Sequence, residues 1–207
     1  MNGAKRQSSA GEATRARIIA ATLDTLQTDG FAGASARAIA KKGGFNQALI
    51  FYHFGSLDDL ILATAAKLMS ERDDRQRITL AGVTKLSDLV RLARELNAED
   101  RASGEIVILT QILAGAAGNP AMGSKLYEMM EPSQTLLAQA VATSLGTAPV
   151  GSLVDVEKIA LAMTSVFLGI ELFDNLDPTR GTAEALFDTF EPLAALLDTI
   201  TGSPGQS

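Results

Sequence analysis

His53 is the only histidine in the chain, and imidazole commonly serves as a general base, a metal ligand or a phosphate contact. A metal centre would need further ligands, but the chain has no cysteine and no second histidine to supply them. The sequence also lacks the Gly-x-Ser-x-Gly motif of an esterase nucleophile. We therefore expect no enzyme activity, no metal and no cofactor. Two interpretations of His53 stay open: local packing at a helix end, and contact with a phosphate group.

The stretch "GFNQALIFYHFG" (44–55) divides its side chains between two faces of a short helix. At 100° per residue Ile50 and Phe54 fall on one face, whereas Ala48 and Tyr52 fall on the opposite one. An exposed tyrosine beside a small alanine does not build a core. It suits a surface that lies in a DNA groove, where alanine allows close approach and the tyrosine hydroxyl reaches a phosphate.

A second short helix precedes this one and completes a helix-turn-helix pattern. It is expected over residues 36–42, with Ser35 as its N-cap and the glycine pair at 43–44 as its end. In this motif the second helix enters the major groove and the first crosses the phosphate backbone. Basic side chains of the first helix and amides at the start of the second then face phosphates and base edges. The residues expected to meet DNA are Ser35, Arg37, Lys41, Asn46, Gln47, Ala48, Leu49, Phe51, Tyr52 and His53.

Helical periodicity dominates the whole chain, and strand alternation is absent from the sequence pattern. Pro132 and Pro192 fall inside expected helices and should bend or split them. We expect an all-α protein of about nine helices, with a three-helix DNA-binding domain and a larger helical domain. The expected helices cover about 13–29, 36–42, 46–54, 56–75, 85–98, 102–118, 120–146, 153–175 and 182–201. The expected domains are a mobile arm (1–11), the helix-turn-helix domain (12–56), an effector-binding and dimerisation domain (57–201) and a mobile tail (202–207).

Composition and charge narrow the class of protein further. Apolar residues make up 46% of the chain, which predicts a packed core, and no apolar run reaches the roughly 18–20 residues that span a bilayer. The absence of cysteine and of a signal peptide agrees with a cytoplasmic location. Residues 1–55 hold seven Lys and Arg against three Asp and Glu, whereas the remainder holds eleven against twenty-one. A basic end on an acidic body favours an anionic partner at that end.

Residues 14–62 resemble the DNA-binding domain of the TetR family of bacterial transcriptional regulators. The segments that carry the resemblance are "IIAATLDTLQTDGF", "SARAIAKKGGFNQALIFYHF" and "SLDDLILA". Two positions depart from the family pattern. Phe51 stands where a tyrosine is common, and Leu57 stands where a lysine often opens the fourth helix. The loss of that cation predicts weaker contact with the DNA backbone, unless the basic residues Arg37, Lys41, Lys5 and Arg6 compensate.

The resemblance implies a dimeric, ligand-responsive repressor that binds a palindromic DNA operator. It implies a homodimer formed through the last two helices, 153–175 and 182–201, whose apolar stripes are wide. It also implies an unidentified small-molecule effector in the helical body, and no membrane partner. The alternative is a helical protein that binds a small molecule or a partner and whose helix-turn-helix is only structural. The candidate effector residues are Thr110, Gln111, Tyr127, Met130, Met163, Phe167 and Glu171.

Overall fold

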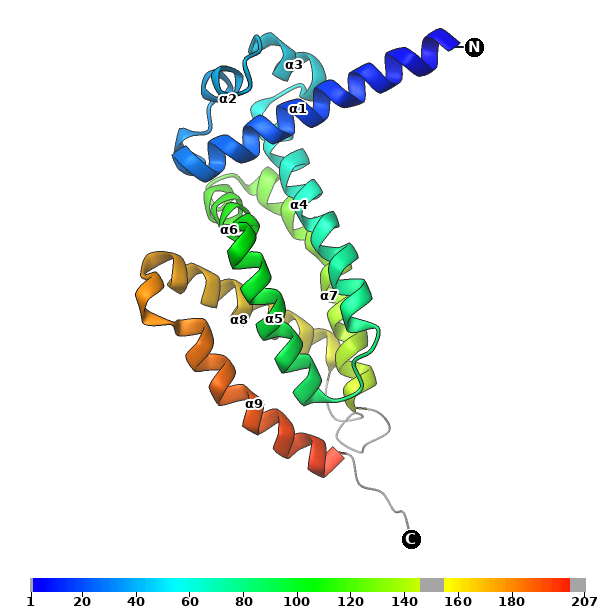
Figure 1. Ribbon diagram of the computed structural model, residues 1–207, viewed down its shortest axis with the longest axis vertical. Coiled ribbons are helices and arrows are strands. Elements are labelled where there is room, and N and C mark those ends of the chain that lie inside the picture. The colour runs from blue at the N-terminus through cyan, green and yellow to red at the C-terminus, as the bar shows by residue number, and fades with distance from the viewer. Residues whose placement is uncertain (1, 146–154, 202–207) are drawn as a thin grey trace. The chain divides into compact units, whose positions relative to one another are not determined.

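The computed structural model describes residues 2–145 and 155–201, and within these ranges it is built from nine α-helices and one 3-10 turn, without strands (Figure 1). The predicted tail at 202–207 and the side chains of Lys5 and Arg6 lie outside the described part. The all-α class is confirmed. The helices are α1 (Asn2–Gly33), α2 (Ala36–Gly43), α3 (Ala48–Phe54), α4 (Leu57–Leu80), α5 (Leu86–Ser103), α6 (Glu105–Ala116), α7 (Pro120–Leu145), α8 (Val156–Leu176) and α9 (Thr182–Thr201), with the 3-10 turn η2 (Pro178–Arg180) between the last two.

Several helix boundaries differ from those expected. Helix α1 begins at Asn2, so the backbone of the predicted arm is helical, while its mobility stays a prediction. Gly30, which follows the expected helix, has a positive φ of 71°, but its ψ of 179° makes a kink and one more helical turn follows. Helix α5 continues to Ser103 because Gly104, with φ 72°, ends it and donates its N–H to two preceding carbonyl groups. Neither α7 nor α9 splits at its internal proline.

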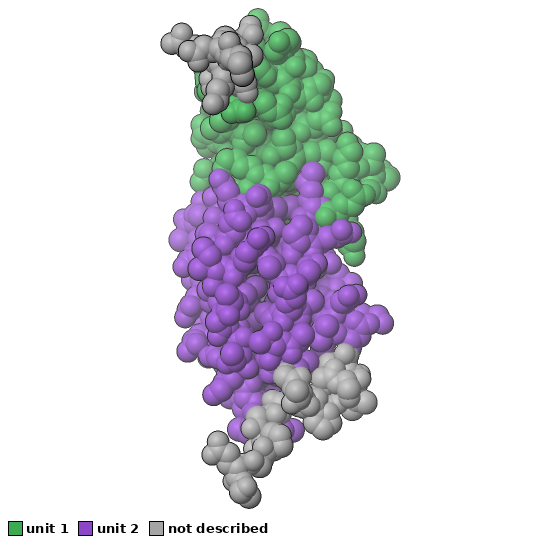
Figure 2. Space-filling view, turned by 90° about the vertical axis from the view of Figure 1, so that its right-hand side faces the viewer, with its two compact units in different colours: residues 1–68, 107–128 green, residues 69–106, 129–207 purple. Residues whose placement is uncertain are grey.

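The chain divides into two compact units. Unit 1 comprises residues 1–68 and 107–128, and unit 2 comprises residues 69–106 and 129–207 (Figure 2). The division into domains at residue 57 stays a prediction.

The core of unit 1 joins the first four helices. Its buried residues come from α1, α2, α3 and the start of α4, and partly buried apolar side chains surround them. Ile50 is the one fully buried residue of α3, and the partly buried Leu49 and Phe54 of the same helix pack against this core beside it. The buried members of this core are Ile18, Ala21, Ile39, Ala40, Ile50 and Leu60.

Helix α6 also contributes to unit 1, through a close contact with the end of α1. The ring of Phe31 lies against Gly115, where an added Cβ would come within 2.3 Å of the ring. The start of α4 has polar contacts of its own in this unit. The Asn119 side chain donates to the Asp58 carboxylate (2.9 Å), and Lys125 pairs with Asp59 (3.7 Å).

In unit 2, helices α5 and α9 pack side by side (Figure 1). Asp198 of α9 accepts hydrogen bonds from the backbone N–H groups of Leu86 and Ser87 (2.8 and 3.0 Å), so it caps the start of α5 from another helix. Arg94 of α5 pairs with three acidic side chains of α9, one of them Glu191 at 2.9 Å. These contacts tie the two helices together near both ends of their contact.

No single helix in the described ranges is long and apolar enough to cross a membrane. The bent pair α3 and α4 passes that test only when its two helices are taken together, by length and composition.

Candidate nucleic-acid interface

Helix α2 begins and ends as the sequence predicts. Ser35 has an extended backbone, and its Oγ accepts the N–H of Ala38 at 3.2 Å. Gly44 closes the helix in the left-handed conformation (φ 63°, ψ 41°), and its N–H donates to the carbonyl of Lys41. The next N–H, that of Phe45, donates to the carbonyl of Ala40 at 3.0 Å, so the chain turns sharply toward α3.

Position 43, just before that turn, has no room for a side chain, so it must be glycine. A Cβ at this position would lie 2.1 Å from the ring of Phe45 and 2.8 Å from the Cβ of Ala21. The turn can therefore approach α1 closely only because residue 43 has no side chain.

Asn46 starts the second helix. Its side-chain oxygen accepts the N–H of Ala48 (2.9 Å), and its carbonyl accepts the N–H of Leu49 (3.0 Å). Gln47 already has helical dihedral angles (φ −55°, ψ −24°), so Asn46 acts as the N-cap although the regular helix is assigned from Ala48. The amide of Asn46 is thus used within the protein, and only its remaining N–H₂ group is available to DNA.

The two faces of α3 are those predicted. Ile50 is fully buried, whereas Tyr52 is 82% exposed and Phe51 is 48% exposed. Ala48 is exposed as well, and Phe54 is partly buried. The helix therefore presents a large aromatic side chain and a small one on its outer face.

His53 is partly buried at the end of α3. Its ring meets that of Tyr52 edge to face, with the ring centres 5.0 Å apart. Among the residues the structure describes, no group of acidic, histidine or cysteine side chains is placed to bind a metal ion. Packing at the helix end is thus observed, and contact with a phosphate stays a prediction.

Eight of the ten residues predicted to meet DNA are exposed, and the other two are partly buried. The helix-turn-helix brings them together on α2, the turn and α3 in unit 1. Leu57, at the start of α4, is partly buried and packs against the core of unit 1. The exposed members are Ser35, Arg37, Lys41, Asn46, Gln47, Ala48, Phe51 and Tyr52, and the partly buried ones are Leu49 and His53.

Two arginines of α1 belong to this region but were not predicted from the sequence. Arg17 donates to the carbonyl oxygens of Gly43 and Gly44 at 2.8 and 2.9 Å. Arg15 donates to the backbone carbonyl of His53. Helical periodicity places Arg17 opposite the apolar side of α1, and no local signal shows that its long side chain reaches the turn between α2 and α3.

The residues proposed for an effector are divided between the units. In unit 1, Thr110 is buried and donates to the carbonyl of Val107 (3.0 Å), and Tyr127 is 54% exposed. The side-chain oxygen of Gln111 is buried without a hydrogen-bond partner and lies 3.7 Å from the position of a Cβ on Gly30.

The unit 2 candidates have different surroundings. Met163 packs with the apolar cluster around Val83 and Val141, and Met130 is partly buried. The Arg72 guanidinium lies over the ring of Phe167, and its central carbon is 4.7 Å from the ring centre. An effector role for these residues stays a prediction.

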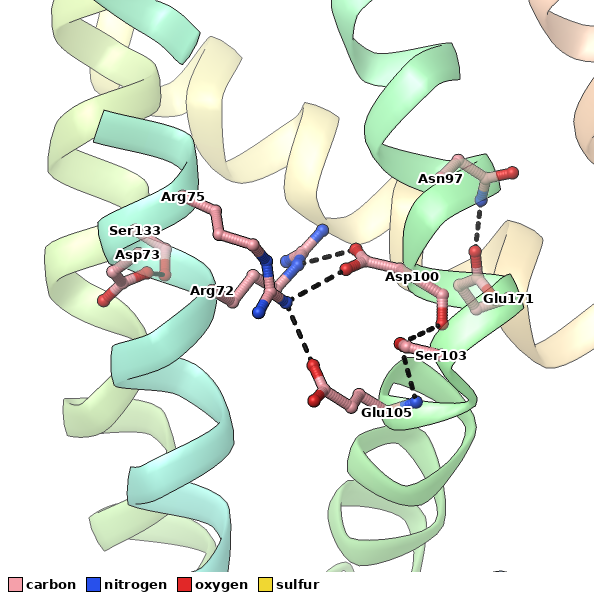
Figure 3. Close-up of polar contacts among 9 residues, drawn as sticks. All are labelled: Arg72, Asp73, Arg75, Asn97, Asp100, Ser103, Glu105, Ser133 and Glu171. Atoms are coloured by element: carbon pink, nitrogen blue, oxygen red, sulfur yellow. Dashed lines mark hydrogen bonds and ion pairs between the residues drawn. The ribbon is translucent and has the colours of Figure 1, made fainter. Parts of the chain in front are cut away.

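Glu171, the remaining candidate, is buried on α8 and accepts a hydrogen bond from Asn97 of α5, near a second set of polar contacts that joins α4 to α5 (Figure 3). Asp100 pairs with Arg72 at 2.8 Å and with Arg75 at 3.6 Å, and Asn97 donates to Glu171. Burial raises the pKa of Glu171 to about 7, opposed by the charge of Arg101 and assisted by the nearby acidic groups.

The apolar stripes of α8 and α9 are only partly used inside unit 2. Ala160, Ile170, Ala183, Phe187 and Ala194 are buried. A second set is left on the surface, although such side chains are normally buried in a core. The exposed set comprises Leu161, Val166, Leu172, Phe173 and Leu176 of α8, and Phe190, Leu193, Leu196, Leu197 and Ile200 of α9.

Comparison with known proteins identifies the segment that contains the helix-turn-helix. Residues 18–64 match the family described as bacterial regulatory proteins, tetR family. An uncharacterized HTH-type transcriptional regulator of Mycobacterium bovis is 29% identical over 133 residues, which is 64% of this chain and 59% of that protein. The match thus spans less than two thirds of the relative. Both descriptions are of transcriptional regulators and not of enzymes, in agreement with the expectation from the sequence.

Solved structures extend the similarity to most of the chain. FadR from Bacillus subtilis, solved in complex with stearoyl-CoA, is 13% identical and superposes with a TM-score of 0.70, covering 86% of this chain and 96% of FadR. The multidrug binding protein EbrR, solved with ethidium, is 24% identical with a TM-score of 0.63, covering 84% of this chain and 95% of EbrR. At these identities the likeness establishes the fold alone.

Proposed function

We propose that this chain, whose residues 18–64 match the TetR family of bacterial regulatory proteins, is a sequence-specific DNA-binding transcriptional regulator of that family. The observation that carries the proposal is the outer face of α3. Tyr52 and Ala48 are exposed on a helix whose opposite side is anchored by the fully buried Ile50. A small alanine beside an 82% exposed tyrosine suits a surface that lies in a DNA groove, because alanine allows close approach and the tyrosine hydroxyl can reach a phosphate.

The neighbouring charges support a nucleic-acid partner. Arg37 and Lys41 are exposed on α2, the helix that crosses the DNA backbone in this motif. No acidic residue lies between positions 30 and 57, so the motif itself carries only positive charge. In a duplex bound at this face, the phosphates would meet these cations. The major groove would meet Tyr52, Gln47 and Ala48.

A homodimer is part of the proposal. The exposed apolar side chains of α8 and α9 form the surface that a second copy of the chain would cover. A two-fold dimer carries two recognition helices and reads a palindromic operator with half-sites about one helical turn apart or a multiple of that. The cytoplasm, where chromosomal DNA lies, is the proposed location.

Ligand response completes the proposal. FadR and EbrR, which share the fold, were solved with stearoyl-CoA and ethidium, both of which have large apolar parts. We propose an organic effector for this chain, with repression relieved when the effector favours a state that binds the operator poorly. Thr110, Gln111, Tyr127, Met130, Met163, Phe167 and Glu171 remain its proposed contacts.

Selection of bound fragments from a random duplex library tests the DNA-binding proposal directly. We expect enrichment of one palindromic sequence, and affinity for it should fall by about 10³–10⁵ between 50 and 200 mM salt if 6–10 phosphates are contacted. Failure to enrich any sequence, together with salt-independent behaviour, would favour the alternative in which the helix-turn-helix is only structural. Calorimetry with apolar organic compounds would then be the next test.

A further inference from the structure

We propose that Arg15 and Arg17 of α1 are positioning residues that set the pose of the recognition helix α3. Each binds backbone carbonyl groups at the C-terminal end of one helix of the helix-turn-helix. The inference rests on the proposed function, because a pose matters only if α3 reads DNA.

Arg17 acts at the end of α2. Its Nη2 donates to the carbonyl oxygens of Gly43 (2.8 Å) and Gly44 (2.9 Å). Carbonyl groups at the end of a helix have no following helical N–H to bind, and the partial negative charge there favours a cation. The guanidinium also lies over the ring of Phe45, 5.5 Å from its centre. One side chain thus fixes the turn from which α3 departs.

Arg15 acts at the other end of α3. Its Nη1 donates to the carbonyl of His53 in the last turn, and its guanidinium lies over the ring of Phe54, 4.2 Å from the centre. Both arginines come from the same helix, two residues apart, and they bind on either side of a helix of seven residues. Side chains of α1 therefore contact the backbone just before the start of α3 and at its end.

This arrangement supplies what the core lacks. Ile50 is the only fully buried residue of α3, and the partly buried Leu49 and Phe54 pack beside it, so the apolar core holds this two-turn helix from one face only. Recognition side chains must be held to within about 0.5 Å and 10–20° to act. The two guanidinium contacts, one at each end, restrict the tilt of α3. They also explain why exposed arginines occur on α1, where no base or phosphate contact is needed to account for them.

The test separates positioning from ordinary phosphate contact by comparing Arg17→Lys with Arg17→Ala. Lysine keeps the charge but cannot donate to two carbonyl groups with a planar fork while stacking on Phe45. The positioning role predicts that both variants lose about tenfold in affinity for the library-selected duplex, with an unchanged slope of affinity against salt. Arg91→Ala, which removes an exposed arginine of α5, is the matched control and should bind as the parent does.

A second readout needs no DNA. His53 is the only histidine in the sequence, so its two ring carbon protons give NMR signals that no other histidine overlaps. These signals sense the ring of Tyr52, 5.0 Å away. We expect Arg15→Lys and Arg15→Ala to shift them both, whereas Arg91→Ala leaves them unmoved.

The outcomes are distinct. If Arg17→Lys preserves affinity and Arg17→Ala lowers the salt slope by about one, Arg17 is a phosphate contact and the inference is overturned. Unmoved His53 signals in both Arg15 variants would likewise overturn it for that residue. If the parent chain selects no duplex, the proposed function fails, but the NMR comparison still decides whether the arginines hold α3.

Discussion

The side-chain amide of Asn97 on α5 donates a hydrogen bond to the carboxyl group of Glu171 on α8, and both side chains are buried in unit 2. Glu171 is 1% exposed, and Asp100 and Asp174 are close enough to oppose the ionisation of its carboxyl group. Arg101 and Arg72 favour ionisation, but their guanidinium groups pair with Asp174 and Asp100 instead. Glu171 is consequently a carboxyl group that takes up a proton when the protein folds near neutral pH.

This linkage predicts how stability depends on pH. The pKa of Glu171 rises from 4.5 in the unfolded chain to about 7 in the folded one, so the folded state holds the proton more tightly. The free energy of unfolding therefore falls as the pH increases from about 4.5 to about 7, by up to about 3 kcal/mol from this group. Glu171→Gln keeps an acceptor for Asn97 and should remove that dependence, so the variant is more stable than the parent at pH 8.

Urea unfolding of the parent and of Glu171→Gln between pH 5 and pH 8 measures the difference. Glu157→Gln is the control, because Glu157 is exposed on the same helix and the substitution changes the same charge. Its curve should run parallel to that of the parent. Parallel curves for Glu171→Gln and the parent would show that Glu171 is ionised in the folded protein across this range.

The two faces of α3 predict opposite effects of truncation. Tyr52→Ala should weaken binding to the selected duplex by about 1–3 kcal/mol and leave the Tm nearly unchanged, because the side chain is 82% exposed. Ile50→Ala should lower the free energy of unfolding by about 2–5 kcal/mol, as truncation of a fully buried side chain does. Thermal unfolding and duplex titration of both variants check this. Loss of folding in Tyr52→Ala would contradict the assignment of the faces.

The turn before α3 predicts a further loss of stability. Gly43→Ala places a Cβ 2.1 Å from the ring of Phe45, so the ring must move, at a cost of about 1–3 kcal/mol. Gly82→Ala is the matched control, because a Cβ there meets nothing within 4 Å. Chemical denaturation of the two variants gives the comparison. Equal stability of Gly43→Ala and the parent would mean that the turn adapts without cost.

Features set by local sequence were predictable. The period of 3.6 residues determines which side of α3 holds Ile50 and which holds Tyr52, and the caps at Ser35 and Asn46 are local hydrogen bonds. The end of α5 was missed because periodicity alone does not mark a boundary, although Gly104 was the available signal.

Features that depend on distant parts of the chain could not be predicted in this way. The helical turn after Gly30 carries Phe31, whose ring packs on Gly115, more than 80 residues later. Arg17 reaches the carbonyl groups of Gly43 and Gly44 only because the fold brings the turn beside α1. The stripes of α8 and α9 show the same limit, since periodicity identifies an apolar side chain but not whether its own unit covers it.

The exposed apolar side chains of α8 and α9 predict that a charged residue introduced among them prevents the proposed dimer. Leu176 is 74% exposed and Leu196 is 58% exposed, so neither contributes much to the core of unit 2. Under the dimer proposal, Leu176→Glu and Leu196→Glu each bury a carboxylate against apolar groups of a second copy, which costs several kcal/mol. Analytical ultracentrifugation should then show the parent at twice 21.7 kDa and both variants near 21.7 kDa.

The control for this prediction is Ile78→Glu, which introduces the same charge at an 80% exposed position of α4 outside the two helices. It should sediment as the parent does. A dimer dissociates on dilution, so the Tm of the parent and of Ile78→Glu should rise with protein concentration, whereas the Tm of the two monomeric variants should not. A parent chain that sediments as a monomer at every concentration would refute the dimer, and operator selection would then yield single half-sites in place of palindromes.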